Sequence, residues 1–284
     1  MRSAVDPQAS TVSIYGSDIK YWIYHPEQSR TILMLHGFRG NHIGLKYIIA
    51  GLNGYCIIVP DLPGFGESTP MTDRSHDITG YGDFAREFTT RLRLKQPVLL
   101  GHSFGSIIAA HLAARSPELF ERLILLNPIA VKPGGGIKAA PTQFVKAYYW
   151  LGTYSSSNWS RRILVSRTFS HLMSLSLSRT KDKNIRNIVY NHHLSDLEQP
   201  QNREVIAKSF AESISKTALD DAARITLDTL LIAGDKDPIA TLAAQRHLKD
   251  TIPTAQLIII PKVGHLIHLE TPRPAAEAIA QYLG

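Results

Sequence analysis

The chain has 284 residues, of which 44% are hydrophobic and 19% are charged. This length and balance indicate one large domain or a core domain with an insertion, and they exclude an intrinsically disordered chain. The net charge is +7, and the whole excess lies in residues 131–225, which hold 14 Lys and Arg against 7 Asp and Glu. These basic residues are scattered and form no long run, so a solvated helical surface is favoured over nucleic-acid binding.

The single cysteine, Cys56, lies in an apolar run and cannot form an internal disulfide. The first ten residues lack the apolar stretch of a signal peptide, and no apolar run approaches the roughly 18 residues that span a membrane. We therefore expect no membrane span and a cytoplasmic location. A homodimer is compatible with this composition.

The first half of the chain alternates short apolar strands with helical patterns. Alternating residues at 11–15 and 20–24 bracket Gly16-Ser17-Asp18 and predict an opening hairpin. Helices are expected at 45–52, 81–93 and 106–115, and buried strands at 31–35, 55–59, 97–101 and 122–126. Short apolar strands separated by helices indicate an α/β fold with a mostly parallel, doubly wound sheet covered on both faces.

This rhythm breaks after Asn127 and resumes at Thr229. The intervening segment has no convincing strand, but it has amphipathic helical patterns, a glycine run at 134–136 and an aromatic cluster (Tyr148, Tyr149, Trp150, Tyr154 and Trp159). Strands at 229–233 and 256–260 and helices at 239–248 and 273–283 then complete the pattern. We predict an α/β core formed by residues 1–130 and 225–284, with a helical cap over 131–224 that hinges at the glycine run.

A serine lies where a predicted strand turns directly into a helix, in the motif Gly101-His102-Ser103-Phe104-Gly105. This turn forces Ser103 into a strained backbone conformation that holds its hydroxyl above the sheet edge. Side chains at Gly101 and Gly105 would collide with neighbouring backbone. The motif alone also fits an ordinary tight turn, so its meaning depends on a base, an acid and oxyanion donors elsewhere.

Such groups are expected at the carboxyl ends of the other parallel strands. The strand ending at Leu35 leads to His36-Gly37-Phe38, the strand ending at Ala233 leads to Gly234-Asp235-Lys236-Asp237, and the last strand leads to Val263-Gly264-His265. A serine, an acid and a histidine therefore follow one another in chain order. A histidine can take the proton of a serine hydroxyl during nucleophilic attack, and a carboxylate can orient that histidine.

These motifs resemble those of the α/β-hydrolase superfamily, in the branch with a helical cap after the sixth strand. The resemblance rests on H-G-F, D-L-P-G-F-G-E-S, G-H-S-F-G, G-D-K-D-P and G-H-L-I-H-L-E-T-P, and it covers nearly the whole chain outside residues 131–225. It implies that Ser103 is the nucleophile, that His265 is the base, and that the N–H groups of Phe38 and Phe104 form an oxyanion hole. It places the acid at Asp237, with Asp235 as the rival.

The function expected from this resemblance is hydrolysis of an ester of a small or medium apolar acyl group through an acyl-enzyme. Alternatives on the same scaffold are a carbon–carbon bond hydrolase, a thioesterase, an acyltransferase and a non-catalytic ligand-binding protein. The residues Arg39-Gly40-Asn41 stand where carbon–carbon hydrolases usually carry glycine and proline, which lowers that alternative.

Several further residues receive an expected role. Candidate substrate-pocket residues are His36, His102, Tyr148, Trp150 and Trp159, although both histidines also suit loop organisation. We expect His268 to be structural and to point away from the site, and Asp61 to pair with Arg39 or Lys46. The adjacent His192 and His193 would diverge on a helix, so we expect no metal site, and the motifs imply no cofactor.

Overall fold

Eight strands form one sheet in the order β1-β2-β4-β3-β5-β6-β7-β8. The computed structural model describes residues 6–132, 139–154, 157–198 and 202–284, so the predicted hinge at 134–136 lies outside them. The strands are β1 (Gln8–Ile14), β2 (Ser17–Tyr24), β3 (Thr31–Leu35), β4 (Cys56–Pro60), β5 (Val98–His102), β6 (Leu123–Leu126), β7 (Thr229–Gly234) and β8 (Ala255–Ile260).

The strand directions follow the connections between them. β1 and β2 form the predicted antiparallel hairpin, and β2 pairs antiparallel with β4. The remaining neighbours, from β4 through β3 to β8, are parallel. The predicted mostly parallel sheet is therefore confirmed, and the carboxyl ends of its central strands meet at one edge.

Alternate residues of the buried strands pack into two separate hydrophobic cores, one on each face of the sheet. Leu33 and Leu99 pack on one face with helices α2 (Ile78–Arg91) and α3 (Phe104–Arg115). Their neighbours Ile32 and Leu100 point to the opposite face, where α1 (Lys46–Ile49) and α11 (Pro272–Leu283) cover them. Because both faces are covered, these strands are apolar throughout, as the sequence indicates.

The helix expected at 45–52 is shorter in the structure. The 3₁₀-helix η1 (His42–Leu45) leads into α1, which ends at Ile49. Gly51, Asn53 and Gly54 follow directly, and such residues are poor helix formers. Two further core helices are α9 (Leu242–Thr251), between β7 and β8, and the short α10 (Ile267–Glu270).

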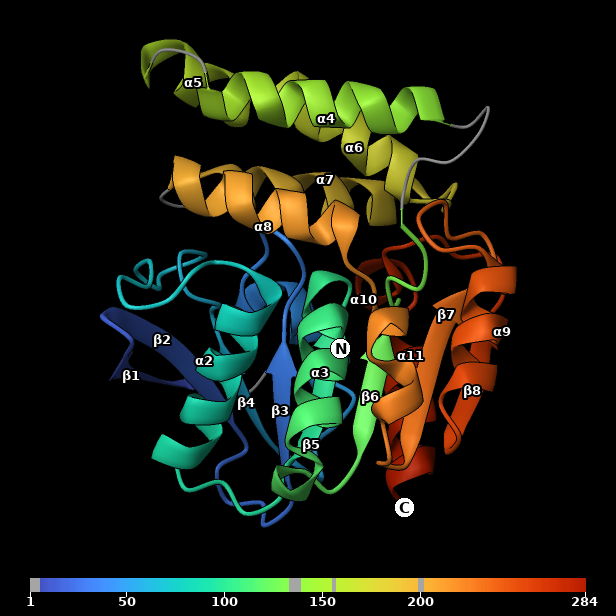
Figure 1. Ribbon diagram of the computed structural model, residues 1–284. Coiled ribbons are helices and arrows are strands. Elements are labelled where there is room, and N and C mark those ends of the chain that lie inside the picture. Colours follow the sequence, from blue (N-terminus) through green and yellow to red (C-terminus); the bar gives the residue numbers. More distant parts are fainter. Residues whose placement is uncertain (1–5, 133–138, 155–156, 199–201) are drawn as a thin grey trace.

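Five helices form a layer over the carboxyl edge of the sheet, toward which the β3 arrow in Figure 1 points. They are α4 (Ala139–Tyr154), α5 (Ser157–Leu164), α6 (Arg167–Leu177), α7 (Lys183–Glu198) and α8 (Arg203–Ser215). All five follow β6 in the chain. Ala218 and Ala222 come after α8 and are buried in the main core, so the helical layer itself ends with α8.

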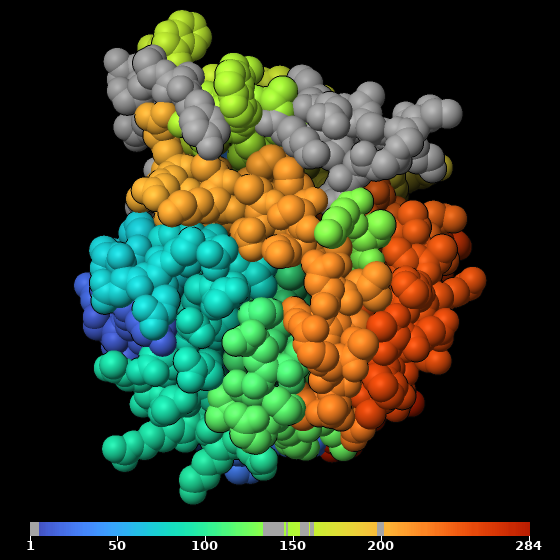
Figure 2. Space-filling view, viewed as in Figure 1, coloured from blue at the N-terminus to red at the C-terminus, as the bar shows by residue number. Residues whose placement is uncertain are grey.

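This layer rests on the core through α8, which Figure 2 shows in orange directly above the cyan segment that contains α2. The Tyr81 hydroxyl lies 2.9 Å from Ser209 Oγ, and the Ile78 N–H donates to Glu212 Oε2 at 3.0 Å. These polar contacts join the start of α2 to α8. In the described part of the chain, no helix is long and apolar enough to cross a membrane.

Candidate active site

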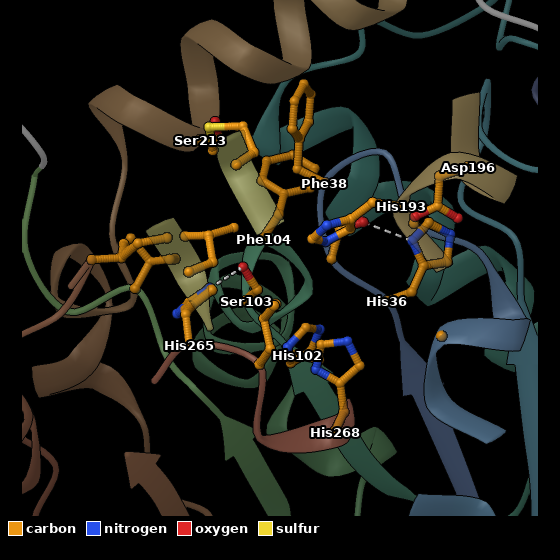
Figure 3. A pocket seen from close by; sticks show the side chains of 18 of the residues that line it. His36, Phe38, His102, Ser103, Phe104, His193, Asp196, Ser213, His265 and His268 are labelled. Carbon is orange, nitrogen blue, oxygen red and sulfur yellow. Dashed lines mark hydrogen bonds between the residues drawn. The ribbon is translucent and has the colours of Figure 1, made fainter. Parts of the chain in front are cut away.

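Ser103 occupies a sharp turn between the last residue of β5 and the first residue of α3. Its backbone angles are φ +52° and ψ −117°. A non-glycine residue in such a sparsely populated region costs about 1–3 kcal/mol and persists only where packing on both sides enforces it. The buried strand β5 and the buried helix α3 supply that packing. The Ser103 side chain lines a cavity under the helical layer (Figure 3).

Two glycines allow this turn to pack against its neighbours. A Cβ on Gly105 would lie 2.3 Å from the Leu35 carbonyl oxygen, and a Cβ on Gly101 would lie 2.3 Å from the Gly105 carbonyl oxygen. Both distances are far below van der Waals contact. Side chains at these two positions would therefore collide with the backbone, as the motif predicts. Their absence lets the start of α3 pack closely against the end of β3.

A continuous series of hydrogen bonds runs from the Ser103 hydroxyl to a buried carboxylate. Ser103 Oγ lies 2.8 Å from His265 Nε2, and His265 Nδ1 lies 2.7 Å from Asp237 Oδ2. A carboxylate can only accept, so Nδ1 carries the ring proton and Nε2 is free to accept from the hydroxyl. The structure thus brings together a serine, a histidine and an acid from three strand ends, and the acid is Asp237, which the family resemblance favours over Asp235.

Asp237 is held in place by more than the histidine. Its Oδ1 accepts from the backbone N–H groups of Ile239 at 2.8 Å and Ala240 at 3.2 Å, and Asn127 Nδ2 donates to Oδ2 at 3.3 Å. Burial alone would raise the pKa of this carboxyl, but His265 and the two backbone donors outweigh it and lower the pKa. The rival, Asp235, instead lies 3.8 Å from Lys236.

The turn after β3 passes directly beside the serine. A Cβ on Gly37 would lie 3.3 Å from Ser103 Cβ, and Phe38 lines the cavity. His36 fixes this turn because its Nε2 accepts from the Leu62 N–H at 2.8 Å while its Nδ1 lies 2.8 Å from the Gly37 carbonyl oxygen. Burial lowers the pKa of His36, so the ring is neutral. His36 lines the cavity and also organises the loop.

Phe104 provides a second backbone N–H beside the serine. It is the first residue of α3, so its N–H has no partner within the helix. The rings of Phe38 and Phe104 meet edge to face with centroids 6.3 Å apart. The Phe104 N–H therefore lies at the serine turn, and Phe38 belongs to the neighbouring turn after β3.

Most of the chain matches one known family. The sequence profile described as alpha/beta hydrolase fold matches residues 30–272. The chain belongs to the α/β-hydrolase family. An esterase from Exiguobacterium antarcticum superposes on this α/β-hydrolase with a TM-score of 0.80 at 18% identity, covering 97% of this chain and 99% of the esterase.

Two relatives of this α/β-hydrolase have named activities. The 2-hydroxymuconate semialdehyde hydrolase of Pseudomonas sp. (strain CF600) is 28% identical over 229 residues, which cover 80% of this chain and 76% of that protein. Lipase 1 of Psychrobacter immobilis is 25% identical over 245 residues, which cover 84% of this chain and 72% of the lipase. This α/β-hydrolase therefore resembles both a 2-hydroxymuconate semialdehyde hydrolase and a lipase.

The cavity of this α/β-hydrolase has a volume of about 620 Å³ and two chemically different ends. We call the apolar end the wall formed by Val145, Tyr149, Met173, Phe210 and Ile214. We call the polar end the wall formed by Asn41, His102, His192, His193, Asp196 and His268. Ser103 lies between Phe38 on one side and His102 and His268 on the other (Figure 3).

The aromatic residues predicted to line the pocket lie elsewhere. Trp150 and Trp159 are 61% and 64% exposed, and neither lines the cavity. Tyr148 is buried, but it stacks on Phe169 behind the cavity wall with ring centroids 3.3 Å apart. Its neighbour Tyr149 lines the cavity instead. One residue along a helix turns the side chain by about 100°, so a run of aromatics does not reveal which ring faces inward.

Two other expectations need correction. Asp61 does not pair with Arg39 or Lys46; its Oδ1 accepts from the His42 N–H at 2.8 Å and its Oδ2 from the Glu67 N–H at 2.8 Å. These bonds stabilise the loop after β4. His268 does not point away from the site, because it lines the cavity with its ring centroid 4.0 Å from that of His102.

The polar end is not recognisable from the sequence. Asn41 and Asp196 are 155 residues apart, yet Asn41 Nδ2 donates to Asp196 Oδ1 at 3.1 Å. The one sequence signal is the adjacent pair His192 and His193, whose ring centroids are 6.2 Å apart. Among the described residues, no group of three or more His, Cys, Asp or Glu is arranged to hold a metal ion.

Proposed function

We propose that this α/β-hydrolase cleaves carboxylic esters with a small or medium apolar acyl group through an acyl-enzyme on Ser103. The observation that carries the proposal is the hydrogen-bonded series Ser103–His265–Asp237 at a strained turn inside the cavity. A serine hydroxyl is a weak nucleophile at neutral pH, and a hydrogen-bonded base within about 3 Å is what activates it. The likeness to a lipase is consistent with this chemistry.

The first half of the reaction acylates the serine. Ser103 Oγ attacks the ester carbonyl while its proton moves to His265 Nε2, and the N–H groups of Phe38 and Phe104 stabilise the oxyanion. Asp237 stabilises the imidazolium that forms and keeps its own negative charge, since its pKa is lowered. His265 then gives the proton to the departing alcohol oxygen.

The second half returns the free enzyme. A water molecule loses a proton to His265 Nε2 and attacks the acyl carbon, and the same two backbone donors stabilise the second oxyanion. The carbon–oxygen bond to Ser103 breaks, and the serine regains its proton from His265. In both halves of the reaction His265 carries the proton, and Asp237 orients and stabilises His265.

A fluorophosphonate probe is expected to label Ser103 and no other serine. The reason is that Ser103 combines a strained turn, a hydrogen-bonded base and adjacent oxyanion donors. Mass spectrometry of the digested protein locates the adduct, and heat-denatured protein is the control. An adduct on a different serine, or none on folded protein, would refute the proposal.

The apolar end of the cavity is the candidate acyl site. Tyr149 and Phe210 stack with ring centroids 4.2 Å apart, and Tyr149 meets Phe38 edge to face at 5.4 Å. These three rings continue from the proposed oxyanion donor into the helical layer. An apolar acyl chain placed there would bury its methylene groups against rings, and each buried methylene contributes about 0.8 kcal/mol.

Tyr149→Ala is expected to move the preferred acyl chain of p-nitrophenyl esters to a longer length, with kcat/KM ratios changing by about 10–200-fold, since a methylene of fit is worth about 1–3 kcal/mol. The measurement is kcat/KM for the acetate through decanoate esters. Trp159→Ala is the matched control, because Trp159 is 64% exposed and lies outside the cavity wall. An unchanged chain-length profile in Tyr149→Ala would place the acyl site elsewhere.

Carbon–carbon bond hydrolysis is the second candidate, favoured by the 28% identity to a 2-hydroxymuconate semialdehyde hydrolase. To test this candidate, the protein is incubated with 2-hydroxymuconate semialdehyde and the loss of the substrate's absorbance is measured alongside the ester panel. Rapid loss of this substrate together with slow ester turnover would favour the second candidate. Including a thioester and an acceptor alcohol in the same panel separates the thioesterase and acyltransferase alternatives.

A further inference from the structure

Two imidazole nitrogens inside the cavity wall have no hydrogen-bond partner among the described residues. They are His102 Nε2 and His268 Nδ1, on side chains of residues that are 6% and 5% exposed. A buried polar atom left without a partner destabilises the folded state, so such atoms are rare in folded proteins. Both residues line the cavity and lie next to each other below Ser103 in Figure 3.

The other members of the polar end are already organised around them. His192 Nε2 lies 3.6 Å from Asp196 Oδ2, and Asn41 Nδ2 donates to Asp196 Oδ1. On the same helix, His193 Nδ1 lies 2.5 Å from Ser174 Oγ of α6. The helical layer and the core thus both contribute polar atoms to one wall. Within this wall, His102 Nε2 and His268 Nδ1 are the buried atoms that lack a hydrogen-bond partner in the residues that the structure describes.

The polar end carries little net charge at neutral pH. Burial lowers the pKa of His192 to about 3 and that of His193 to about 4, and it lowers the pKa of His102 and His268 well below the ordinary value. Burial also raises the pKa of Asp196 to about 8, although the nearby Arg39 acts to lower it. This carboxyl is therefore protonated at neutral pH.

The six residues that define the polar end include no Lys or Arg. Lys132 lines the cavity but is exposed, and Arg39, which lies close enough to lower the pKa of both His193 and Asp196, donates to the Leu164 carbonyl oxygen at 2.9 Å. The imidazole rings of the polar end are themselves neutral. Neutral imidazoles each offer one donor and one acceptor, which matches a hydroxyl group.

We propose that the polar end is a subsite for an uncharged, hydroxyl-bearing alcohol portion of the ester, such as a vicinal diol, bound by His102 and His268. This inference rests on the proposed ester hydrolysis, in which the apolar end holds the acyl chain. The alcohol portion is the remaining arm, and His265 must reach its oxygen to protonate it. The His102 ring centroid lies 6.1 Å from that of His265, so a hydroxyl one or two carbons beyond the ester oxygen falls beside His102.

A pair of esters that differ only in two hydroxyl groups tests the subsite. We expect kcat/KM for 2,3-dihydroxypropyl butanoate to exceed that for propyl butanoate by about tenfold, the value of one to two net hydrogen bonds. In His268→Phe an aromatic ring is kept and the nitrogens are lost, so this ratio is expected to fall to about one, while His268→Gln is expected to retain part of it. His247→Phe, at an exposed histidine of α9, is the matched control and is expected to keep the ratio of the unmodified protein.

Three outcomes overturn the subsite or its assignment. A ratio near one in the unmodified protein removes the subsite. A ratio that survives in His268→Phe means that other groups bind the hydroxyls. A gain for propyl 3-hydroxybutanoate, with none for the dihydroxypropyl ester, assigns the polar end to the acyl arm instead.

A binding measurement separates this inference from the proposed function. In Ser103→Ala protein, calorimetry is expected to show 1-O-butylglycerol binding more tightly than butyl propyl ether, with the difference lost when His268→Phe is added. If the enzyme hydrolyses neither ester but this difference is present, the proposed function fails and the subsite stands. Equal affinities, or tighter binding of the anion butoxyacetate than of the diol, overturn the inference.

Discussion

Asp237→Asn is expected to lower kcat/KM for p-nitrophenyl butyrate by about 10⁴-fold without unfolding the protein. His265 Nδ1 donates to Asp237 Oδ2 at 2.7 Å, which fixes the tautomer that leaves Nε2 free to take the Ser103 proton. An asparagine can turn its amide donor toward Nδ1 and hold the wrong tautomer. It also removes the charge that stabilises the imidazolium.

Asp235→Asn is the control for this substitution. Asp235 lies two residues away in the same loop, and its Oδ2 is 3.8 Å from an exposed lysine. We expect its kcat/KM to stay within about twofold of that of the unmodified protein, since surface ion pairs contribute little. Small and equal losses in the two variants would show that the carboxylate partner is another residue.

Gly105→Ala is expected to destabilise the protein by about 1–3 kcal/mol and to reduce kcat by about 10²-fold. The added Cβ would lie 2.3 Å from the Leu35 carbonyl oxygen and 2.7 Å from that of His36, so the start of α3 must move away from β3. Ser103 precedes this helix and moves with it. Urea unfolding and p-nitrophenyl butyrate turnover, measured on the same preparation, report the two effects.

Gly54→Ala provides the comparison for that variant. No heavy atom lies within 4 Å of a Cβ placed on Gly54, and its φ lies outside the left-handed region. Its stability is expected to change by no more than about 0.5 kcal/mol and its turnover not at all. If Gly105→Ala behaved in the same way, the close packing at the serine turn would not control catalysis.

The sequence predicts the sheet and the proposed catalytic residues because both depend on short-range patterns. Ser103, Asp237 and His265 each follow an apolar strand within a few residues, and parallel strands bring their carboxyl ends to one edge. The order of residues along the chain therefore predicts that a serine, an acid and a histidine meet, and the choice of Asp237 over Asp235 comes from the resemblance to the α/β-hydrolase superfamily. The glycines around Ser103 are predictable for the same local reason.

The cavity wall depends on information that short-range patterns lack. Whether Tyr148, Tyr149 or Trp150 faces the cavity depends on how α4 is rotated, and that rotation is set by packing against α5 and α8. The contact between Asn41 and Asp196 depends on where α7 lies over the core. The sequence predicts a structural role for His268 because its spacing from His265 makes the two side chains point in different directions. It does not reveal that the ring of His102 lies beside His268 in the cavity wall.

The proposed base, His265, is tied to the helical layer by its own backbone. The His265 N–H donates to the carbonyl oxygen of Leu177, the last residue of α6, at 3.1 Å. A Cβ on the preceding Gly264 would lie 2.3 Å from that same oxygen. For enzyme engineering, this hydrogen bond and this close approach mean that the end of α6 has to stay in place relative to His265. A chimaera that exchanges the helical layer to change substrate preference must keep a carbonyl at this position and a glycine opposite it, or it alters the base along with the specificity.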